Sequence, residues 1–249
     1  EKTRQAIDPL TVSFPNLTID EACAIPLKQI ERKVEEGSTI VGKKIGLTSK
    51  VMQEMFHVNE PDYGHILDSM VLLDGEEINL DIFLQPKIEF EIAFILKEDL
   101  KGPGIRINDV IQATGYVAPA IEIIDSRISD WKIKFEDTVA DNGSSARAII
   151  GGNPTPIEKV DLVNIGVALY KNGRYLDSAA GAAVMGNPVR AVAWLANALG
   201  KFDIPLLKDE VILSGALMGA VPIEDGDSFL AEFAHIGSVS ASFYKGANK

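Results

Sequence analysis

Two glutamates in one apolar stretch are the first residues of this chain whose types and spacing suggest chemistry. Residues 87–94 read KIEFEIAF, so Glu89 and Glu91 alternate with apolar side chains. In a β-strand, residues two apart project from the same face, which brings the two carboxylates close together. The common interpretation of such alternation is a strand with one solvated face. The long apolar context is instead typical of a central strand, whose faces are both covered.

A third acid, Glu122, lies in the apolar run VAPAIEII, where a solvated face is hard to arrange. Burial of a carboxylate costs several kcal/mol unless the carboxylate is paired or bound to a cation. Three acids on two inner strands, with few basic residues nearby in the sequence, therefore indicate a divalent cation. Ligation by oxygen alone favours Mg²⁺ or Mn²⁺ over Zn²⁺.

Other polar residues lie in segments that also have common structural explanations. Lys44 of KKIGLTS follows a strand-like run, as a surface lysine would, and Asp62 of EPDYGH lies in a turn-like segment where aspartate is frequent. Residues 137–147, DTVADNGSSAR, predict a non-periodic loop that either caps its own backbone or lines a site. From the residues alone, the function is that of a Mg²⁺-dependent enzyme acting on a small anion.

The elements that would position these residues indicate an α+β fold. A capping pattern at 18–21 opens an amphipathic helix that should end near Glu36, and residues 187–200 predict another helix. Asp-Gly at 74–75 and Asn-Gly at 172–173 each separate strand-like runs and predict two hairpins.

The pattern becomes mainly β after residue 65. We therefore expect a small helical N-terminal lobe over residues 1–65, with both helix and strand, and a larger β-rich catalytic domain with a mixed sheet over residues 66–249.

Composition and charge exclude several classes of function. The chain has 249 residues, 46% of them hydrophobic, which suffices for a real core. Its formal net charge is −12 without any basic block, so we expect no nucleic acid partner. We expect no membrane span, because no apolar run approaches the required length. The single cysteine, Cys23, excludes an internal disulfide and fits a cytoplasmic protein.

Six longer stretches carry a resemblance to a known family. They are VGKKIGLTSK, VNEPDYGHILDSM, QPKIEFEIAFIL, ATGYVAPAIEIIDSRISDWKIKFEDTVADNGSS, NPVRAVAWLANALG and VILSG. Together they resemble the 2-keto-4-pentenoate hydratase / 4-oxalocrotonate decarboxylase family of the fumarylacetoacetate hydrolase superfamily, over nearly the whole chain from about residue 18. The resemblance implies a fold of the fumarylacetoacetate-hydrolase-like type and a homo-oligomer. It also implies association with neighbouring enzymes of the same pathway.

The resemblance also implies roles for the candidate residues. The family's metal ligands, an ExE pair and a third Glu about thirty residues later, fall on Glu89, Glu91 and Glu122. The lysine of the family's K-x-G-L-T motif falls on Lys44, which would anchor the substrate's carboxylate or assist proton transfer. Asp62 would be a proton shuttle, and Ser145 would bind the substrate's carboxylate.

The implied substrates are 2-hydroxy-dienoates, or their 2-oxo-enoate tautomers, from the meta-cleavage of catechols in aromatic hydrocarbon catabolism. The implied Mg²⁺ would chelate the C1 carboxylate and the C2 oxygen and make the 2-oxo group an electron sink. Two lyase reactions of the family share this sink. The hydratase adds water to C4 of 2-hydroxypenta-2,4-dienoate, and the decarboxylase expels the distal carboxylate of 2-oxo-3-hexenedioate as CO₂.

The sequence resembles both branches of the family. DWKIKFEDTVADN, KVMQEMFHVNEPDYGH and NPVRAVAWLANALG are similar to the hydratases, whereas DNGSSAR, GAAVMGNP and GALMGAVPI are similar to the decarboxylases. Arg147 in DNGSSAR would pair with a distal carboxylate or make a structural ion pair. The greater length of matching sequence favours the hydratase, with the decarboxylase as the alternative.

Two further hypotheses come from outside these branches. An inactive scaffold partner of pathway enzymes would have no need to bury uncompensated carboxylates, so the acid triad and Lys44 argue against it. A hydrolase of the fumarylacetoacetate type would use a His-Glu pair to activate water, and no histidine of this chain lies in a matching motif.

Overall fold

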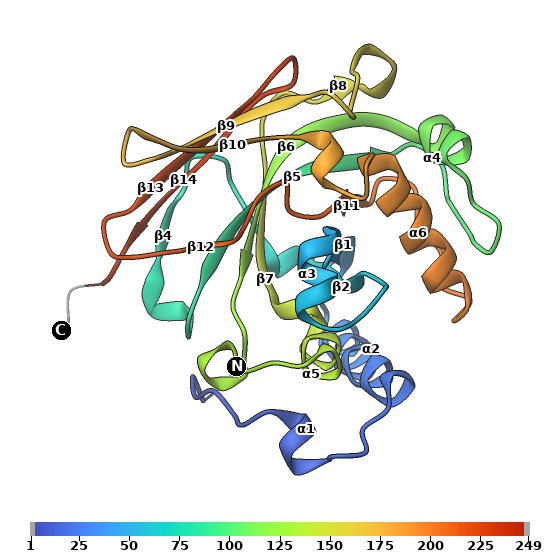
Figure 1. Ribbon diagram of the computed structural model, residues 1–249, viewed down its shortest axis with the longest axis vertical. Helices are drawn as coiled ribbons and strands as arrows, with labels where there is room; N and C mark the ends of the chain where they lie inside the picture. Colours follow the sequence, from blue (N-terminus) through green and yellow to red (C-terminus); the bar gives the residue numbers. More distant parts are fainter. Residues whose placement is uncertain (1–2, 247–249) are drawn as a thin grey trace.

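A curled β-sheet of nine strands forms the centre of the part of the chain that the structure describes (Figure 1). The computed structural model describes residues 3–246. Seven of the strands follow one another in the order β2 (Asp62–Leu67), β1 (Ile40–Gly46), β11 (Val211–Leu213), β5 (Lys87–Leu96), β6 (Thr114–Ile124), β7 (Ser145–Ile150) and β3 (Val71–Leu72). Two short strands extend it: β12 (Val221–Pro222) pairs with β5, and β8 (Thr155–Pro156) pairs with β6.

A second sheet, of five strands within the described residues, covers one face of β5 and β6. Its order is β10 (Arg174–Ala180), β9 (Gly166–Lys171), β13 (Ser228–Phe233), β14 (Gly237–Tyr244) and β4 (Glu77–Asn79). Alternation along β13 buries Phe229, whose ring centroid lies 6.2 Å from that of Phe90 on β5 and 6.0 Å from that of Phe243 on β14. The main hydrophobic core therefore lies between the two sheets.

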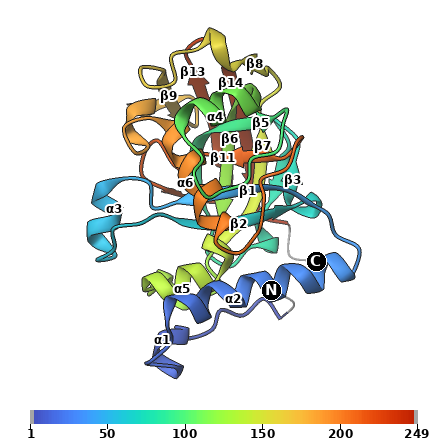
Figure 2. The ribbon, with the colours of Figure 1, turned by 90° about the vertical axis from the view of Figure 1, so that its right-hand side faces the viewer.

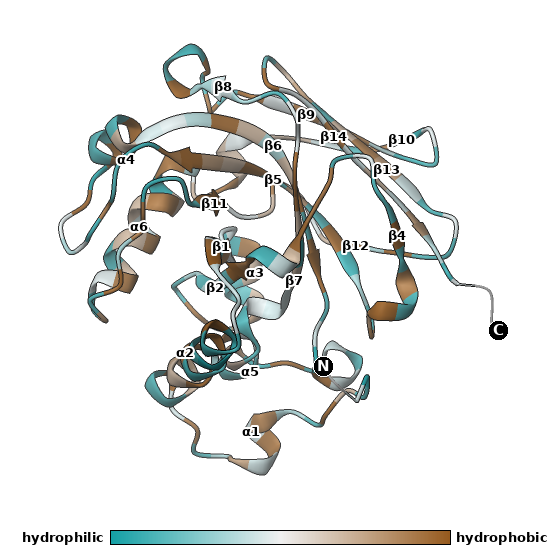
Figure 3. Ribbon diagram, turned by 180° about the vertical axis from the view of Figure 1, so that it is seen from behind, coloured by the Kyte–Doolittle hydropathy of each residue, from teal (hydrophilic) through white to brown (hydrophobic). Residues whose placement is uncertain are grey.

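The same alternation divides β5 into an apolar and an acidic face. Four large side chains of β5 are fully buried and belong to the main core: Ile88, Phe90, Ile92 and Phe94. Glu89 and Glu91 project from the opposite face, because successive side chains of a strand alternate. Figure 3 shows the contrast between the apolar strands β5 and β6 and the more polar helix α2 (Ile19–Glu35).

The helices lie in two groups around the main sheet. α1 (Leu10–Ser13), α2 and α5 (Phe135–Ala140) lie together at one end of the molecule, below the sheet in Figure 2. α4 (Ile107–Ala113) and α6 (Pro188–Gly200) contact each other, and α6 also contacts β1. The short helix α3 (Lys50–Met55) follows β1. Within residues 3–246, no helix combines the length and the apolar character needed to cross a bilayer.

Most of the predicted elements are confirmed, as is the α+β class. α2 begins with a capping box in which Thr18 and Glu21 exchange hydrogen bonds, and α6 matches the helix predicted at 187–200. The Asn-Gly hairpin joins β9 to β10, with positive φ at both turn residues. Positive φ at both central residues is what a tight two-residue hairpin requires.

The hairpin predicted at Asp74–Gly75 is wrong. β3 pairs with β7 in the main sheet, whereas β4 pairs with β14 in the second sheet. The turn instead docks on β14, where Asp74 Oδ1 accepts a hydrogen bond from the Ser240 N–H and the Gly75 N–H donates to the Ser240 carbonyl. These long-range bonds outweigh the local pairing that the turn residues favour.

The boundary predicted at residue 65 falls within β2, and both β1 and β2 are strands of the main sheet. A division into residues 1–65 and 66–249 as separate folding units stays a prediction.

A buried ion pair joins β1 to the start of β11. Lys43 Nζ lies 2.6 Å from both carboxylate oxygens of Glu210, and the two residues are only 2% and 6% exposed. Burial lowers the pKa of the Lys43 ammonium, and the Glu210 carboxylate opposes that shift. Lys43 and Lys44 are consecutive on β1, so their side chains project from opposite faces of the sheet.

Removal of one partner of this pair should destabilise the fold. Glu210→Gln leaves the Lys43 ammonium buried without a countercharge, so the free energy of unfolding should fall by about 3 kcal/mol. Urea unfolding measures this loss. The double variant K43M/E210L carries neither charge and should unfold closer to the wild type than E210Q does. A wild-type midpoint for E210Q would show that the pair contributes nothing.

Candidate metal centre

Three carboxylates converge on one point of the main sheet. Glu89 on β5 lies directly opposite Glu122 on β6, and Glu91 is two residues further along β5. One oxygen of each can be chosen so that all three lie within 4.8 Å of one another. Glu91 and Glu122 are fully buried, and Glu89 is partly buried. The antiparallel register of two adjacent strands is therefore enough to assemble the cluster.

Within the described residues, these carboxylates have few hydrogen-bond or ion-pair partners. The Gly215 N–H donates a 2.6 Å hydrogen bond to Oε2 of Glu91, but Oε1 of Glu91 and both oxygens of Glu122 lack a hydrogen bond. Lys44 Nζ forms an ion pair with Glu122, 3.3 Å from Oε2, without the angles of a hydrogen bond. Several buried carboxylate oxygens thus share one ammonium, and a hard divalent cation fits this all-oxygen donor set.

The pKa values of the three carboxyls reflect the crowding of negative charge. Burial raises the pKa of Glu89 to about 7; Glu122 and Asp62 add to the rise, and Lys44 opposes it. Burial also raises the pKa of Glu91 well above its usual value, and Glu122 and Glu89 reinforce this effect. The pKa of Glu122 is raised by its burial too, against the effect of Lys44. In the absence of a cation, this site therefore holds protons at neutral pH.

Lys44 lies on β1, between the acid triad and Asp62, and is 3% exposed. Burial alone would lower the pKa of its ammonium, but the carboxylates of Glu122, Asp62, Glu89 and Glu91 outweigh burial and raise that pKa. Lys44 is therefore a fixed positive charge in this environment. Gly143 packs on its side chain, since a Cβ added at Gly143 would lie 3.2 Å from both Nζ and Cε of Lys44.

Asp62 begins β2, opposite Gly46 of β1. It is 3% exposed, and its Oδ2 accepts a 3.0 Å hydrogen bond from Thr138 Oγ1. Its other oxygen, Oδ1, is buried without a hydrogen-bond partner.

A cavity of about 510 Å³ opens over Glu89, Lys44 and Asp62. Its polar side also contains Thr138 and Lys87, whose ammonium lies 4.1 Å from the centre of the Trp131 ring. Many of the other lining residues are apolar and come from α3 and from nearby loops, among them Leu47, Val51, Met52, Met55, Phe56, Leu217 and Met218. Such a cavity suits a small anion with a hydrocarbon chain.

The other two predicted residues are absent from the described lining of this cavity, although Ser145 lies beside one of the triad acids. Ser145 is buried beside Glu122, where its hydroxyl lowers the pKa of that carboxyl, and it also lines a neighbouring cavity of about 430 Å³. Arg147 lines that neighbouring cavity and is absent from the described lining of the acidic one. It pairs with Ile123, so it projects from the opposite face to Glu122, and its guanidinium lies 5.7 Å from the Phe83 ring centre.

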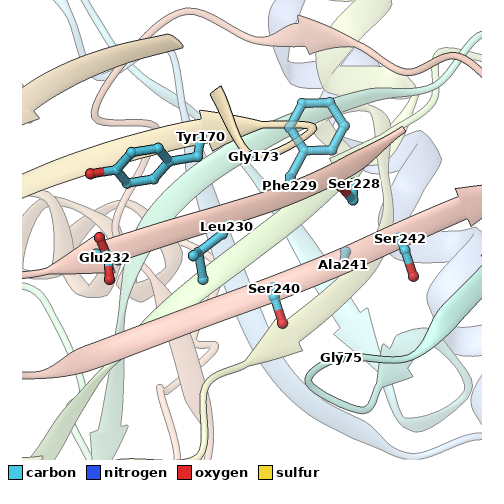
Figure 4. A pocket seen from close by; sticks show the side chains of 10 residues that line it. All are labelled: Gly75, Tyr170, Gly173, Ser228, Phe229, Leu230, Glu232, Ser240, Ala241 and Ser242. Carbon is cyan, nitrogen blue, oxygen red and sulfur yellow. The ribbon is translucent and has the colours of Figure 1, made fainter. Parts of the chain in front are cut away.

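Another cavity, of about 560 Å³, lies against β9, β13 and β14 of the second sheet (Figure 4). Its described lining is mainly small or apolar, with Glu232 as the single charged side chain. Its described lining offers no converging carboxylates and no cation.

Sequence reasoning missed Gly215 and Thr138, which hold Glu91 and Asp62 respectively. Thr138 lies in the segment 137–147 that predicted a loop. The structure shows there the end of α5, a 3₁₀ turn over Asn142–Ser144 and the start of β7. Polar residues of this segment obscured its helical part, and no local pattern shows which of them meets Asp62.

Comparison with known proteins agrees with this geometry, although no family model matches the chain. The 2-hydroxyhexa-2,4-dienoate hydratase of Comamonas testosteroni is 45% identical over 244 residues, which cover 97% of this chain and 92% of that protein. A 2-keto-4-pentenoate hydratase of Paraburkholderia xenovorans is 44% identical over 237 residues, with 95% and 88% covered.

A solved structure is similar over nearly the same extent. It is the 4-oxalocrotonate decarboxylase of Pseudomonas putida G7 complexed with magnesium and adipate, with a TM-score of 0.94 and 39% identity, covering 96% of this chain and 91% of that one. At these identities and coverages, the chain belongs to the 2-keto-4-pentenoate hydratase / 4-oxalocrotonate decarboxylase family.

Proposed function

We propose that this chain is a Mg²⁺-dependent lyase that adds water to 2-hydroxypenta-2,4-dienoate or a close analogue in the meta-cleavage degradation of catechols. The convergence of three buried carboxylates beside a cavity for a small anion carries this proposal. The hydratase names of the relatives support the reaction, and the magnesium complex of the similar decarboxylase supports the metal.

Glu89, Glu91 and Glu122 would hold the Mg²⁺, or Mn²⁺ in its place. When bound, this ion supplies a Lewis acid that polarises the C2 oxygen of the substrate. Glu91 is oriented for this role by the Gly215 N–H, which leaves its Oε1 free. Glu122 is oriented by its register opposite Glu89 and by Lys44.

Lys44 would anchor the C1 carboxylate of the substrate. Its raised pKa keeps the side chain an ammonium, which favours binding of an anion over acceptance of a proton. Together with Lys87, it supplies the positive charge on the described lining of the cavity.

Asp62 would move protons. Hydration puts the oxygen of water on C4, while one proton of that water and the enol proton end on C3 and C5. Such transfers need a group that accepts and returns a proton within hydrogen-bond reach of the substrate. Asp62 Oδ1 meets this need, since it is buried, without a hydrogen-bond partner and next to the cavity.

The decarboxylase remains the second candidate, favoured by the TM-score of 0.94 to a decarboxylase. Its dicarboxylate substrate needs a cation for the distal carboxylate, and Arg147 lines a different cavity. Lys87 is the other cation on the described lining of the acidic cavity. The apolar wall from α3 instead favours a substrate with a hydrocarbon end and hence the hydratase.

Ser145, beside Glu122, keeps its proposed role as a ligand of the substrate's carboxylate.

We also propose that the protein is a cytoplasmic homo-oligomer that associates with neighbouring enzymes of its pathway. Light scattering on the purified protein tests the oligomer. Failure to bind Mg²⁺ or Mn²⁺ would favour the inactive scaffold instead.

The proposed reaction can be tested directly. With Mg²⁺, the protein should consume 2-hydroxypenta-2,4-dienoate, which is followed by its ultraviolet absorbance, and mass spectrometry should identify 4-hydroxy-2-oxopentanoate. A parallel sample with 2-oxo-3-hexenedioate should release little CO₂. Release of CO₂ with the dienoate untouched would establish the decarboxylase, and inertness toward both compounds would overturn the proposed function.

Loss of one triad charge should weaken metal binding without unfolding the protein. Glu91→Gln keeps the shape of the side chain and an acceptor for the Gly215 N–H. We expect Mg²⁺ affinity, measured by calorimetry, to fall by about 100-fold or more. Without metal, the variant should be about as stable as the wild type, because the raised pKa of Glu91 already leaves this carboxyl neutral when no cation is bound. Glu77→Gln, at an exposed acid of β4, is the matched control.

Metal binding should strengthen as pH rises. The folded, metal-free protein holds a proton on Glu89 up to about pH 7, whereas an unfolded glutamate releases it near its ordinary pKa of 4.5. The free energy of unfolding of the metal-free protein should therefore fall as pH rises from 4.5 to about 7. Below about pH 7, Mg²⁺ must displace a proton from Glu89 in order to bind. Calorimetry should show affinity falling about tenfold per pH unit below 7 for each proton displaced.

Glu89→Gln provides the control for this pH dependence. It removes the group with the pKa of about 7, so the remaining weak Mg²⁺ affinity should vary less between pH 6 and 8. An unchanged wild-type affinity across that range would contradict the protonated triad.

A further inference from the structure

The two oxygens of the Asp62 carboxylate have different surroundings. Oδ2 accepts a 3.0 Å hydrogen bond from Thr138 Oγ1, whereas Oδ1 has no hydrogen-bond partner. Both residues are nearly fully buried, at 3% and 5% exposed. An ionised carboxylate only accepts hydrogen bonds, so the Thr138 hydroxyl is the donor. Oδ2 is thus held by a hydrogen bond within the protein, whereas Oδ1 is left to accept a proton.

The free oxygen lies over Gly46 and near Lys44, two residues of the cavity lining. A Cβ placed on Gly46, the register partner of Asp62, would lie 2.1 Å from Oδ1 and 3.1 Å from Lys44 Nζ. Oδ1 therefore occupies the space that a side chain at position 46 would fill. The Cβ–Cγ torsion of an aspartate is broad, so without a second restraint the carboxylate can turn in this space. The bond from Thr138 supplies that restraint.

Thr138 is itself held from two sides. Its N–H donates to the Lys134 carbonyl within α5, and its β-branched side chain has few rotamers. The adjacent Asp137 is fully buried and accepts hydrogen bonds from the N–H and the hydroxyl of Thr11, at 3.0 and 2.8 Å, and from the Lys134 N–H. The N-terminal segment thus secures the helix that carries Thr138. The hydroxyl has a defined direction as a result.

We propose that Thr138 is a positioning residue, whose hydroxyl locks the rotation of the Asp62 carboxylate so that Oδ1 faces the substrate during proton transfer. This inference rests on the proposed function, because it concerns the proton-transfer step assigned to Asp62. Thr138 does not bind the metal or anchor the substrate in this scheme. Loss of the Thr138 hydroxyl should therefore lower kcat and leave the binding of substrate and Mg²⁺ largely intact.

The first test is Thr138→Val, which keeps the shape of the side chain and removes its hydroxyl. We expect kcat for hydration of 2-hydroxypenta-2,4-dienoate to fall roughly 10- to 100-fold, with KM and the Kd for Mg²⁺ changed less than about threefold. Thr138→Ser keeps the hydroxyl and should retain most of kcat. Thr138→Ala, which cannot overpack the site, replaces the valine variant if that variant fails to fold.

Thr114→Val is the matched control. Thr114, the first residue of β6, is likewise a buried threonine whose hydroxyl donates one hydrogen bond, to the Val110 carbonyl, and it lies outside the described lining of the cavity. Its loss should lower the melting temperature without lowering kcat. A similar fall in kcat for both variants would mean that any lost buried hydroxyl slows the enzyme and would overturn the inference.

A double-mutant cycle with Asp62→Asn separates positioning from a general structural effect. In D62N there is no carboxylate for the Thr138 hydroxyl to position. The kcat of T138V/D62N should therefore equal that of D62N alone. The inference would be overturned if the double variant lost kcat by the product of the two single losses, or if T138V kept the wild-type kcat. If the wild type itself fails to hydrate the dienoate, the proposed function fails first, and the two failures are thereby distinguished.

Discussion

The burial of three carboxylates beside a single ammonium is the constraint on which the rest of this structure depends. Each buried charge is costly when unpaired, and their mutual repulsion adds to that cost. The protein offsets it through Lys44, the Gly215 N–H and the raised pKa values of the acids. What remains is a strong preference for a hard cation. The site is thus poised for a metal because its metal-free form is electrostatically strained.

The fold tolerates this strain because β5 serves two purposes at once. Its apolar face joins the core between the two sheets, where Phe90 packs near Phe229, while its acidic face forms the candidate metal centre. The hydrophobic burial on one face holds the strand in register, and the register places Glu89 opposite Glu122 on the other. A slip of one residue would send the glutamates into the core, so the stability of the core and the geometry of the site cannot be separated.

Around this centre, the other polar groups are held by segments distant in sequence. Lys44 comes from β1, Asp62 from β2 and Thr138 from α5, and the loop after β11 contributes Gly215. The apolar wall of the cavity comes from α3 and from the segment around Met218. Under the proposed function, the charged end of a substrate and its hydrocarbon end would therefore meet different parts of the chain. Relatives of one family can then share the metal chemistry and differ in the groups at the far end.

Local patterns in the sequence determined a large part of this arrangement. Alternation along 87–94 predicted that the acids share a face, capping residues predicted α2, and Asn172–Gly173 predicted the β9–β10 hairpin, because each depends on near neighbours. Only the tertiary structure decided that Asp74–Gly75 docks on β14, that Arg147 faces another cavity, and that Thr138 reaches Asp62. Those outcomes depend on contacts between residues up to 166 positions apart, and no local spacing encodes them.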